Sequence, residues 1–240
     1  MKSKIWVGVF LLGSILLLLS YISYSFAYGV AERIALDVGL GLTSLSTVFM
    51  AILLGHALIS KEIENRTIHM IVTRSLGRKA FFLGKLLGVI AVLSINVIIL
   101  MSMSFILYFL LGGHYSPLML FSVLFSFFEA TIVLLIVVFF SLITNATLTI
   151  IYGIVIYILG YVISSTLVLQ YVEKNNFLAT VINACYYIFP NFNRLNLKDY
   201  ILYQKTIPME TLMMGTAYAF FYMLLVIVAS LFIFENKNLD

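Results

Sequence analysis

The sequence predicts an all-α protein that crosses a membrane about six times. Of its 240 residues, 63% are hydrophobic and only 10% are charged, and the mean hydropathy is +1.13. Soluble domains are about half apolar and a quarter charged, so this chain has too few charges to cover a folded core with a polar surface. The apolar surface must therefore face lipid.

Six apolar runs are each long enough to cross the hydrocarbon layer. An α-helix rises about 1.5 Å per residue, so about 20 residues span the roughly 30 Å of hydrocarbon. Helices are expected because each one satisfies its own backbone hydrogen bonds in lipid. The predicted spans are Ile5–Phe26, Val38–Ile59, Phe82–Leu111, Leu118–Ile143, Thr147–Leu169 and Leu212–Phe234.

The first and third runs need separate justification. Ile5–Phe26 follows Met1–Lys4 and is longer than the apolar core of most cleaved signal peptides. Neither Ala27 nor Ala31 completes a convincing cleavage site, so we expect a retained span. Phe82–Leu111 exceeds what the hydrocarbon layer requires, so its ends should project from the membrane or the helix should tilt.

The later spans follow one another closely, through short turns at Gly112–Pro117 and Thr144–Ala146. Only two connections are long enough to have a function of their own, the loops Ser60–Phe81 and Gln170–Thr211. Residues 1–240 are therefore expected to form a single transmembrane domain.

Lysine and arginine predict that both termini lie in the cytoplasm. Cytoplasmic segments of membrane proteins carry an excess of these residues, and the rule is strongest in short loops. With the N-terminus inside, most of the positive charge falls on the cytoplasmic side, and four of the five outer charges share one long loop. We therefore expect a multi-pass protein of the cytoplasmic (inner) membrane. The cytoplasmic charges are Lys2, Lys4, Lys61, Arg66, Arg74, Arg78, Lys79, Lys85 and Lys237, and the outer ones are Arg33, Lys174, Arg194, Lys198 and Lys205.

The cytoplasmic loop Ser60–Phe81 is predicted to contain a short amphipathic helix. Glu62 and Glu64 lie near its start and Arg74 near its end, which are the favourable signs for the helix dipole. Such a helix is either a docking element for a cytoplasmic partner or a solvated loop whose charges set the topology. Its apolar side, at a spacing of three to four residues, consists of Ile63, Thr67, Ile68, Ile71 and Val72.

An ordered set of residues surrounds this loop: Glu62 ends one span, Thr67 and Arg78 follow, and Gly84-Lys85 opens the next. This order resembles the second and third spans of ABC-2 type transporter permeases. The branch it most resembles is the one associated with multi-copper enzyme maturation. The likeness covers Asp37–Gly88.

Two further patches resemble the same branch. The segment YYIFPNFNRLNLKD is similar to its Pro-Asn-x-x-x-x-Asn motif, at Pro190, Asn191 and Asn196, and Phe234 with its short polar tail also matches. The chain departs from the family in two places. Members often have proline where Arg74-Ser75-Leu76 stands here. Most members also begin with an amphipathic elbow helix, whereas here Met1–Lys4 precede the first predicted span.

The resemblance implies an ABC-2 (type V) exporter permease fold that works as a dimer, with a second copy or a paralogue, on two ATPase subunits. The loop would insert into an ATPase cleft as a coupling helix, with apolar residues filling a groove and charged residues pairing at its rim. The coupling residues would be Glu62, Glu64, Arg66, Thr67, Ile68, Ile71, Arg74, Arg78 and Lys85.

The chain itself is not expected to be an enzyme. A phosphate-binding loop needs glycine five residues before Gly84 and a hydroxyl after Lys85, but Lys79 and Leu86 occupy those positions. ATP and Mg²⁺ would therefore belong to the partner ATPase, and no cofactor is expected in this chain. No metal-ligand spacing is present, and serine within spans more often serves helix packing than catalysis. A nucleic-acid partner is not expected.

Glu129 is the one residue within a span that demands an explanation. A carboxylate in mid-membrane costs a few kcal/mol, so it should be protonated, paired or facing water. It either lines a substrate path or packs against a polar neighbour such as Asn96, unless it lies nearer the surface.

The outer loop Gln170–Thr211 is predicted to form a short re-entrant or interfacial helix ending at Pro190. Apolar residues recur at helical spacing, and aromatic residues cluster where the membrane interface would lie. The helix either gates the outer side of a dimer or is an anchoring belt. The gate residues would be Phe177, Val181, Ile188, Pro190 and Asn191.

The expected function is that of a transmembrane subunit of an ABC-2 exporter. Its candidate partners besides the ATPase and the second permease copy are lipid and a periplasmic or extracytoplasmic protein. One alternative is a membrane anchor through which an ABC ATPase regulates an envelope machine. Another is a stand-alone secondary transporter.

Overall fold

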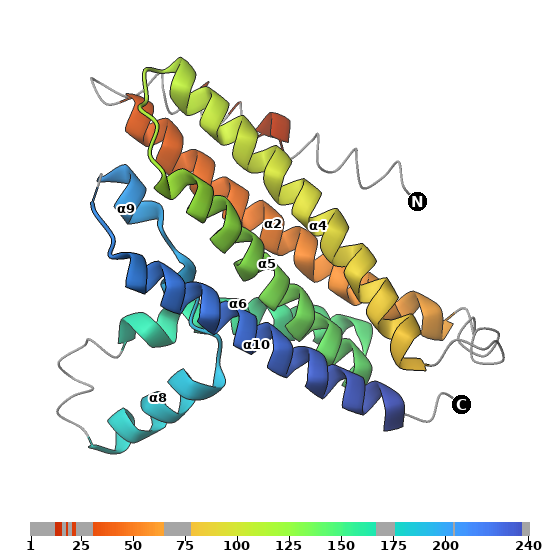
Figure 1. Cartoon of the computed structure of the whole chain (residues 1–240). Helices are drawn as coiled ribbons and strands as arrows, with labels where there is room; N and C mark the ends of the chain where they lie inside the picture. The colour runs from red at the N-terminus through yellow and green to blue at the C-terminus, as the bar shows by residue number, and fades with distance from the viewer. Residues whose placement is uncertain are drawn as a thin grey trace.

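The computed structural model describes residues 13–15, 18, 21–22, 31–64, 78–166, 176–203 and 205–236. Within these ranges the chain forms helices and turns, with no strand (Figure 1). Five helices are long and apolar enough to cross a membrane, which confirms an α-helical multi-pass architecture. They are α2 (Ala31–Glu64), α4 (Arg78–Leu110), α5 (Leu118–Ile143), α6 (Ala146–Thr166) and α10 (Met209–Asn236).

Three short helices connect α6 to α10 on the predicted outer side. They are α8 (Asn176–Ile188), the 3₁₀ helix η1 (Phe192–Leu195) and α9 (Lys198–Leu202). The first predicted span, Ile5–Phe26, lies largely outside the described residues.

The helix ends differ from the predicted span ends around the cytoplasmic loop. We predicted a loop over Ser60–Phe81, but α2 continues to Glu64 and α4 already begins at Arg78. Hydropathy marks where lipid ends, whereas a helix of good formers such as Lys and Glu continues into water. At about 1.5 Å per residue, α2 and α4 are each about 50 Å long, well beyond the hydrocarbon thickness.

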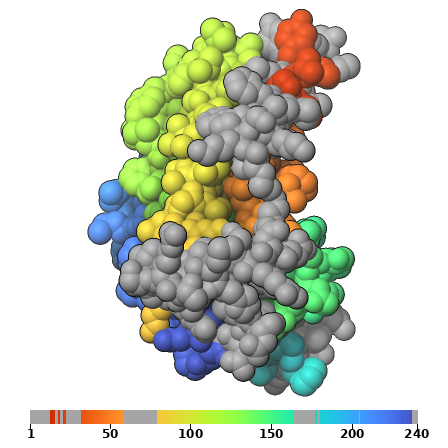
Figure 2. Space-filling model, turned by 90° about the vertical axis from the view of Figure 1, so that its right-hand side faces the viewer, coloured from red at the N-terminus to blue at the C-terminus, as the bar shows by residue number. Residues whose placement is uncertain are grey.

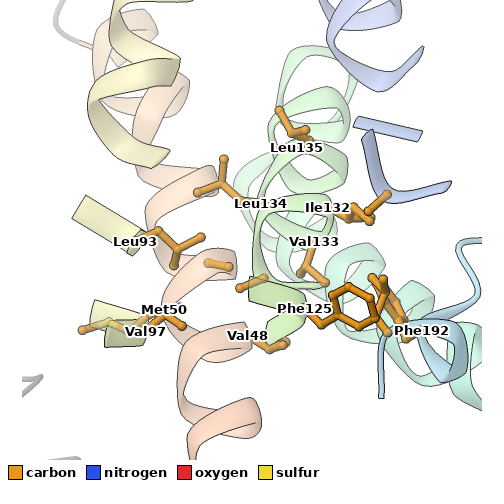
Figure 3. Close-up of a cluster of buried hydrophobic side chains, with 14 of the residues drawn as sticks. Val48, Met50, Leu93, Val97, Phe125, Ile132, Val133, Leu134, Leu135 and Phe192 are labelled. Carbon is orange, nitrogen blue, oxygen red and sulfur yellow. The ribbon is translucent and has the colours of Figure 1, made fainter. Parts of the chain in front are cut away.

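Helix α5 lies at the centre and contacts the other four long helices. Every residue from Glu129 to Val138 is buried. Figure 3 shows Leu134 pointing toward α2 and α4, whereas Ile132 points toward the opposite side of the bundle. A helix that is apolar all round is typical of such a central position.

The five long helices alternate in direction along the chain (Figure 1). An ion pair links two helices at each end of the described bundle, α4 with α10 at one end and α2 with α9 at the other. At the predicted cytoplasmic end, Lys79 of α4 lies 3.0 Å from Glu235 of α10, and the rings of Phe82 and Phe234 lie beside them with centroids 5.0 Å apart. Figure 2 shows part of α4 (yellow) on one face, with part of α2 (orange) beside it.

Candidate functional site

The candidate site is built around Glu129, which is only 4% exposed. Tyr161 of α6 donates a hydrogen bond of 2.7 Å to its Oε1 atom, and Ser44 of α2 donates one of 3.2 Å to the same atom. The Ser44 hydroxyl also lies 3.5 Å from the hydroxyl of Tyr157, one turn before Tyr161. Three spans therefore meet at one carboxyl group.

Aromatic packing holds the two tyrosines in place. Their rings lie edge to face with centroids 5.4 Å apart. The ring of Phe192 packs against both, at 5.5 Å from Tyr157 and 5.8 Å from Tyr161. Gly160 permits this approach, because a Cβ atom there would lie 2.5 Å from the carbonyl oxygen of Pro190.

A cavity of about 230 Å³ extends from Glu129 toward the predicted outer end. At its rim, Lys198 of α9 forms an ion pair of 2.7 Å with Asp37 of α2. The lining is polar near Glu129 and largely apolar elsewhere. It consists of Leu40, Gly41, Ser44, Leu45, Met101, Ser122, Ser126, Glu129, Tyr157, Tyr161, Leu195, Asn196, Leu197 and Lys198.

The side chains around this cavity can be compared with those of known kinds of site. Across the described ranges, no three His, Cys, Asp or Glu residues are grouped so that they could hold a metal ion. The described lining offers one carboxyl group, several hydroxyls, two tyrosine rings, the Asn196 amide and the Lys198 amine, which is paired with Asp37. Such a set is typical of a binding site with a few placed polar groups.

Asn96 is not the partner of Glu129, contrary to one of the alternatives left open by the sequence. It is buried on α4, its side-chain oxygen accepts no hydrogen bond from the described residues, and it does not line the cavity. The partners come instead from α2 and α6, because α5 turns its Glu129 face toward those helices. The third alternative, a position nearer the membrane surface, stays a prediction, because burial of Glu129 among helices does not give its depth in the membrane.

Most of the predicted coupling residues cannot be placed. Glu62 and Glu64 belong to the last turns of α2, Arg78 is the first residue of α4, and Lys85 lies half-buried within α4. The others lie outside the described residues: Arg66, Thr67, Ile68, Ile71 and Arg74.

The predicted outer helix is present as α8, and its apolar stripe is exposed. Phe177 is 75% exposed, Val181 is 44% exposed and Ile188 is 69% exposed. Pro190 and Asn191, by contrast, are buried, and the backbone N–H of Asn191 donates to the Tyr218 hydroxyl at 2.7 Å. The gate residues thus divide into an outward-facing stripe and a buried anchor, and a gating role stays a prediction.

Sequence reasoning missed Ser44, Tyr157, Tyr161 and Lys198. A signal for the tyrosines exists, because Gly153, Tyr157, Gly160 and Tyr161 recur at helical spacing on one face of α6. Small and hydroxyl-bearing residues on one face are typical of close helix packing in membranes.

No protein-family model matches the chain, and no curated protein matches its sequence. Its function is therefore inferred from its residues and its geometry.

Proposed function

We propose that this chain is the transmembrane permease subunit of an ABC-2 exporter, which couples ATP hydrolysis by separate ATPase subunits to movement of a substrate across the membrane. Two observations support this function: the family resemblance of Asp37–Gly88 and the uninterrupted course of helix α2.

The observation that carries the proposal is that α2 connects the predicted coupling segment to the cavity. Glu62 and Glu64 lie at one end of this helix, and Leu40, Gly41 and Ser44 lie on the cavity wall. From Glu64 to Ser44 the helix covers about 30 Å. Because α2 is unbroken over this distance, a push on its cytoplasmic end would move the wall that bears the Ser44–Glu129 hydrogen bond.

The exposed apolar surface supports a partner copy in addition to lipid. The apolar stripe on α8 is exposed, and many apolar side chains of α6 and α10 are exposed as well. In an exporter dimer, part of this surface would face the second subunit and the rest would face lipid.

The proposal is tested by purifying the tagged full chain from its native membranes. We expect an ATPase subunit to co-purify, with ATP hydrolysis in the eluate. Charge reversal of two coupling residues, Arg74→Glu with Arg78→Glu, should abolish co-purification. Charged residues at the rim of a docking helix would pair with opposite charges on the ATPase, and reversal would make these contacts repulsive. Lys205→Glu, at the other end of the bundle, is the matched control and should leave it intact.

A folded chain that purifies alone, without ATPase activity, would contradict the exporter. It would favour the stand-alone secondary transporter, for which the buried Glu129 in an open cavity is the supporting observation. An ATPase that co-purifies without any transport activity in reconstituted vesicles would favour the membrane anchor.

A further inference from the structure

We propose that the cavity beside Glu129 binds a small organic ammonium compound, with the Glu129 carboxylate as counter-charge and the rings of Tyr157 and Tyr161 beside the cation. Binding does not depend on the exporter assignment. That the bound compound is also the transported substrate would rest on the proposed function.

The carboxylate has capacity left for a ligand. The hydrogen bonds from Ser44 and Tyr161 both arrive at Oε1, so neither of these two reaches Oε2, and a carboxylate has about four acceptor positions in all. Glu129 forms no ion pair with a lysine, arginine or histidine in the described ranges, although it is only 4% exposed. A buried carboxyl group without a cation beside it is either protonated or costly, and an ammonium ligand would balance its ionised form.

The two tyrosines suit an ammonium group better than a neutral donor. The negative faces of aromatic rings attract cations, and the attraction is strongest when the cation is removed from water. Tyr157 and Tyr161 lie edge to face, with Phe192 packed behind them. Because these contacts and the hydrogen bond to Glu129 fix the rings, they flank the carboxylate before any ligand arrives.

The size and composition of the cavity favour an organic cation over a metal ion. Its volume of about 230 Å³ is several times the roughly 30 Å³ share of one water molecule. Hard divalent cations take six or more oxygen ligands, with carboxylates prominent among them, whereas the described part of this lining offers a single carboxylate beside hydroxyl and amide oxygens. Leu40, Leu45 and Met101 on the same lining provide an apolar surface for an alkyl or aryl group.

The test is equilibrium dialysis of the purified full chain in lipid nanodiscs. The probes are choline, tetraethylammonium and phenethylammonium, with 3,3-dimethylbutan-1-ol as the uncharged isostere of choline. We expect saturable binding of at least one ammonium probe. For choline, we expect affinity at least about tenfold above that of the isostere, as for the loss of one charge-assisted contact.

Glu129→Gln removes the charge and keeps an acceptor for Ser44 and Tyr161, so the fold should survive. We expect ammonium affinity to fall at least about tenfold. Glu210→Gln makes the same change at an exposed position at the start of α10 and should bind as the unmodified chain does. Size-exclusion chromatography and circular dichroism check that both variants are folded.

Three outcomes would overturn the proposal: no saturable binding of any ammonium probe, equal affinity for choline and its isostere, or unchanged binding in Glu129→Gln.

If Glu129→Gln does not fold, Gly41→Leu replaces it. Within 4 Å, and outside its own helix backbone, a Cβ atom at Gly41 meets one atom of the described residues, the Lys198 amine at 3.4 Å. Leucine there would fill the cavity without changing its charge. Retained binding in that variant would also overturn the proposal. Since the assay contains no ATPase, its failure leaves the exporter proposal standing.

Discussion

Helices α5 and α6 are adjacent in the chain and similarly apolar, yet they occupy opposite environments. In α5, 61% of the most apolar stretch is buried, whereas in α6 the share is 17%. Helix α6 turns glycines and tyrosines toward the bundle and leaves Ile151, Ile154 and Ile158 exposed. The comparison teaches that hydropathy identifies a span but does not say whether it faces protein or lipid, because both are apolar.

The largest expected effect comes from Leu134→Ala in α5. This side chain is fully buried, and truncation would leave a cavity that lipid cannot fill, at a cost of about 3 kcal/mol. Leu148→Ala in α6 is the matched control, because Leu148 is 43% exposed, and it should cost less than about 0.5 kcal/mol. The free energy of unfolding is measured by SDS titration with circular dichroism. Equal losses at both positions would remove the contrast between the two helices.

Gly160→Ala tests the one side of α6 that is tightly packed. The added methyl group would lie 2.5 Å from the Pro190 carbonyl oxygen, so we expect a loss of about 2 kcal/mol from forced separation of α6 and the outer segment. Gly88→Ala in α4 is the control, because among the described residues no atom beyond the local helix backbone lies within 4 Å of the added group. It should be neutral or stabilise by up to about 1 kcal/mol through helix propensity. Tolerance of alanine at Gly160 in the same titration would contradict the close approach.

Tyr161→Phe examines the polar contact between α5 and α6. It removes the hydrogen bond to Glu129 and keeps the ring against Phe192. A hydrogen bond to a charged group contributes about 1.5 kcal/mol, and we expect a loss of that order. Tyr152→Phe is the control, since Tyr152 does not line the described cavity and lies near the start of α6, at the end of the bundle that holds Lys79 and Glu235. A loss no greater than the control's would show that the contact adds nothing to stability.

The smallest effect is expected for Lys79→Ala, which breaks the ion pair between α4 and α10. Both side chains are about half exposed or more, and such surface pairs contribute less than about 1 kcal/mol. A loss above about 2 kcal/mol would mean that this end of the bundle depends on charge. Phe82→Ala, in the adjacent ring contact, should cost more than Lys79→Ala.

The positions of five spans were predictable because hydropathy records transfer into lipid, which acts on each segment separately. Glu129 could be singled out for the same reason, since a lone carboxylate within a span is costly. Its partners could not be predicted, because Ser44 lies 85 residues away in sequence and Tyr161 lies 32 away. Which faces of three helices meet depends on packing, and packing in lipid leaves only a weak pattern of small residues in the sequence.

The ion pair between Asp37 and Lys198 ties the rim of the cavity to α2. Both side chains are partly exposed, at 50% and 31%, so dissolved ions can screen them. The Debye length falls from about 10 Å at 0.1 M salt to about 3 Å at 1 M. Any motion that separates α9 from α2 must break this pair, and such a motion would therefore become easier as the ionic strength around the pair rises. In this way the salinity on the side of the membrane that bears the rim would affect how readily the rim opens.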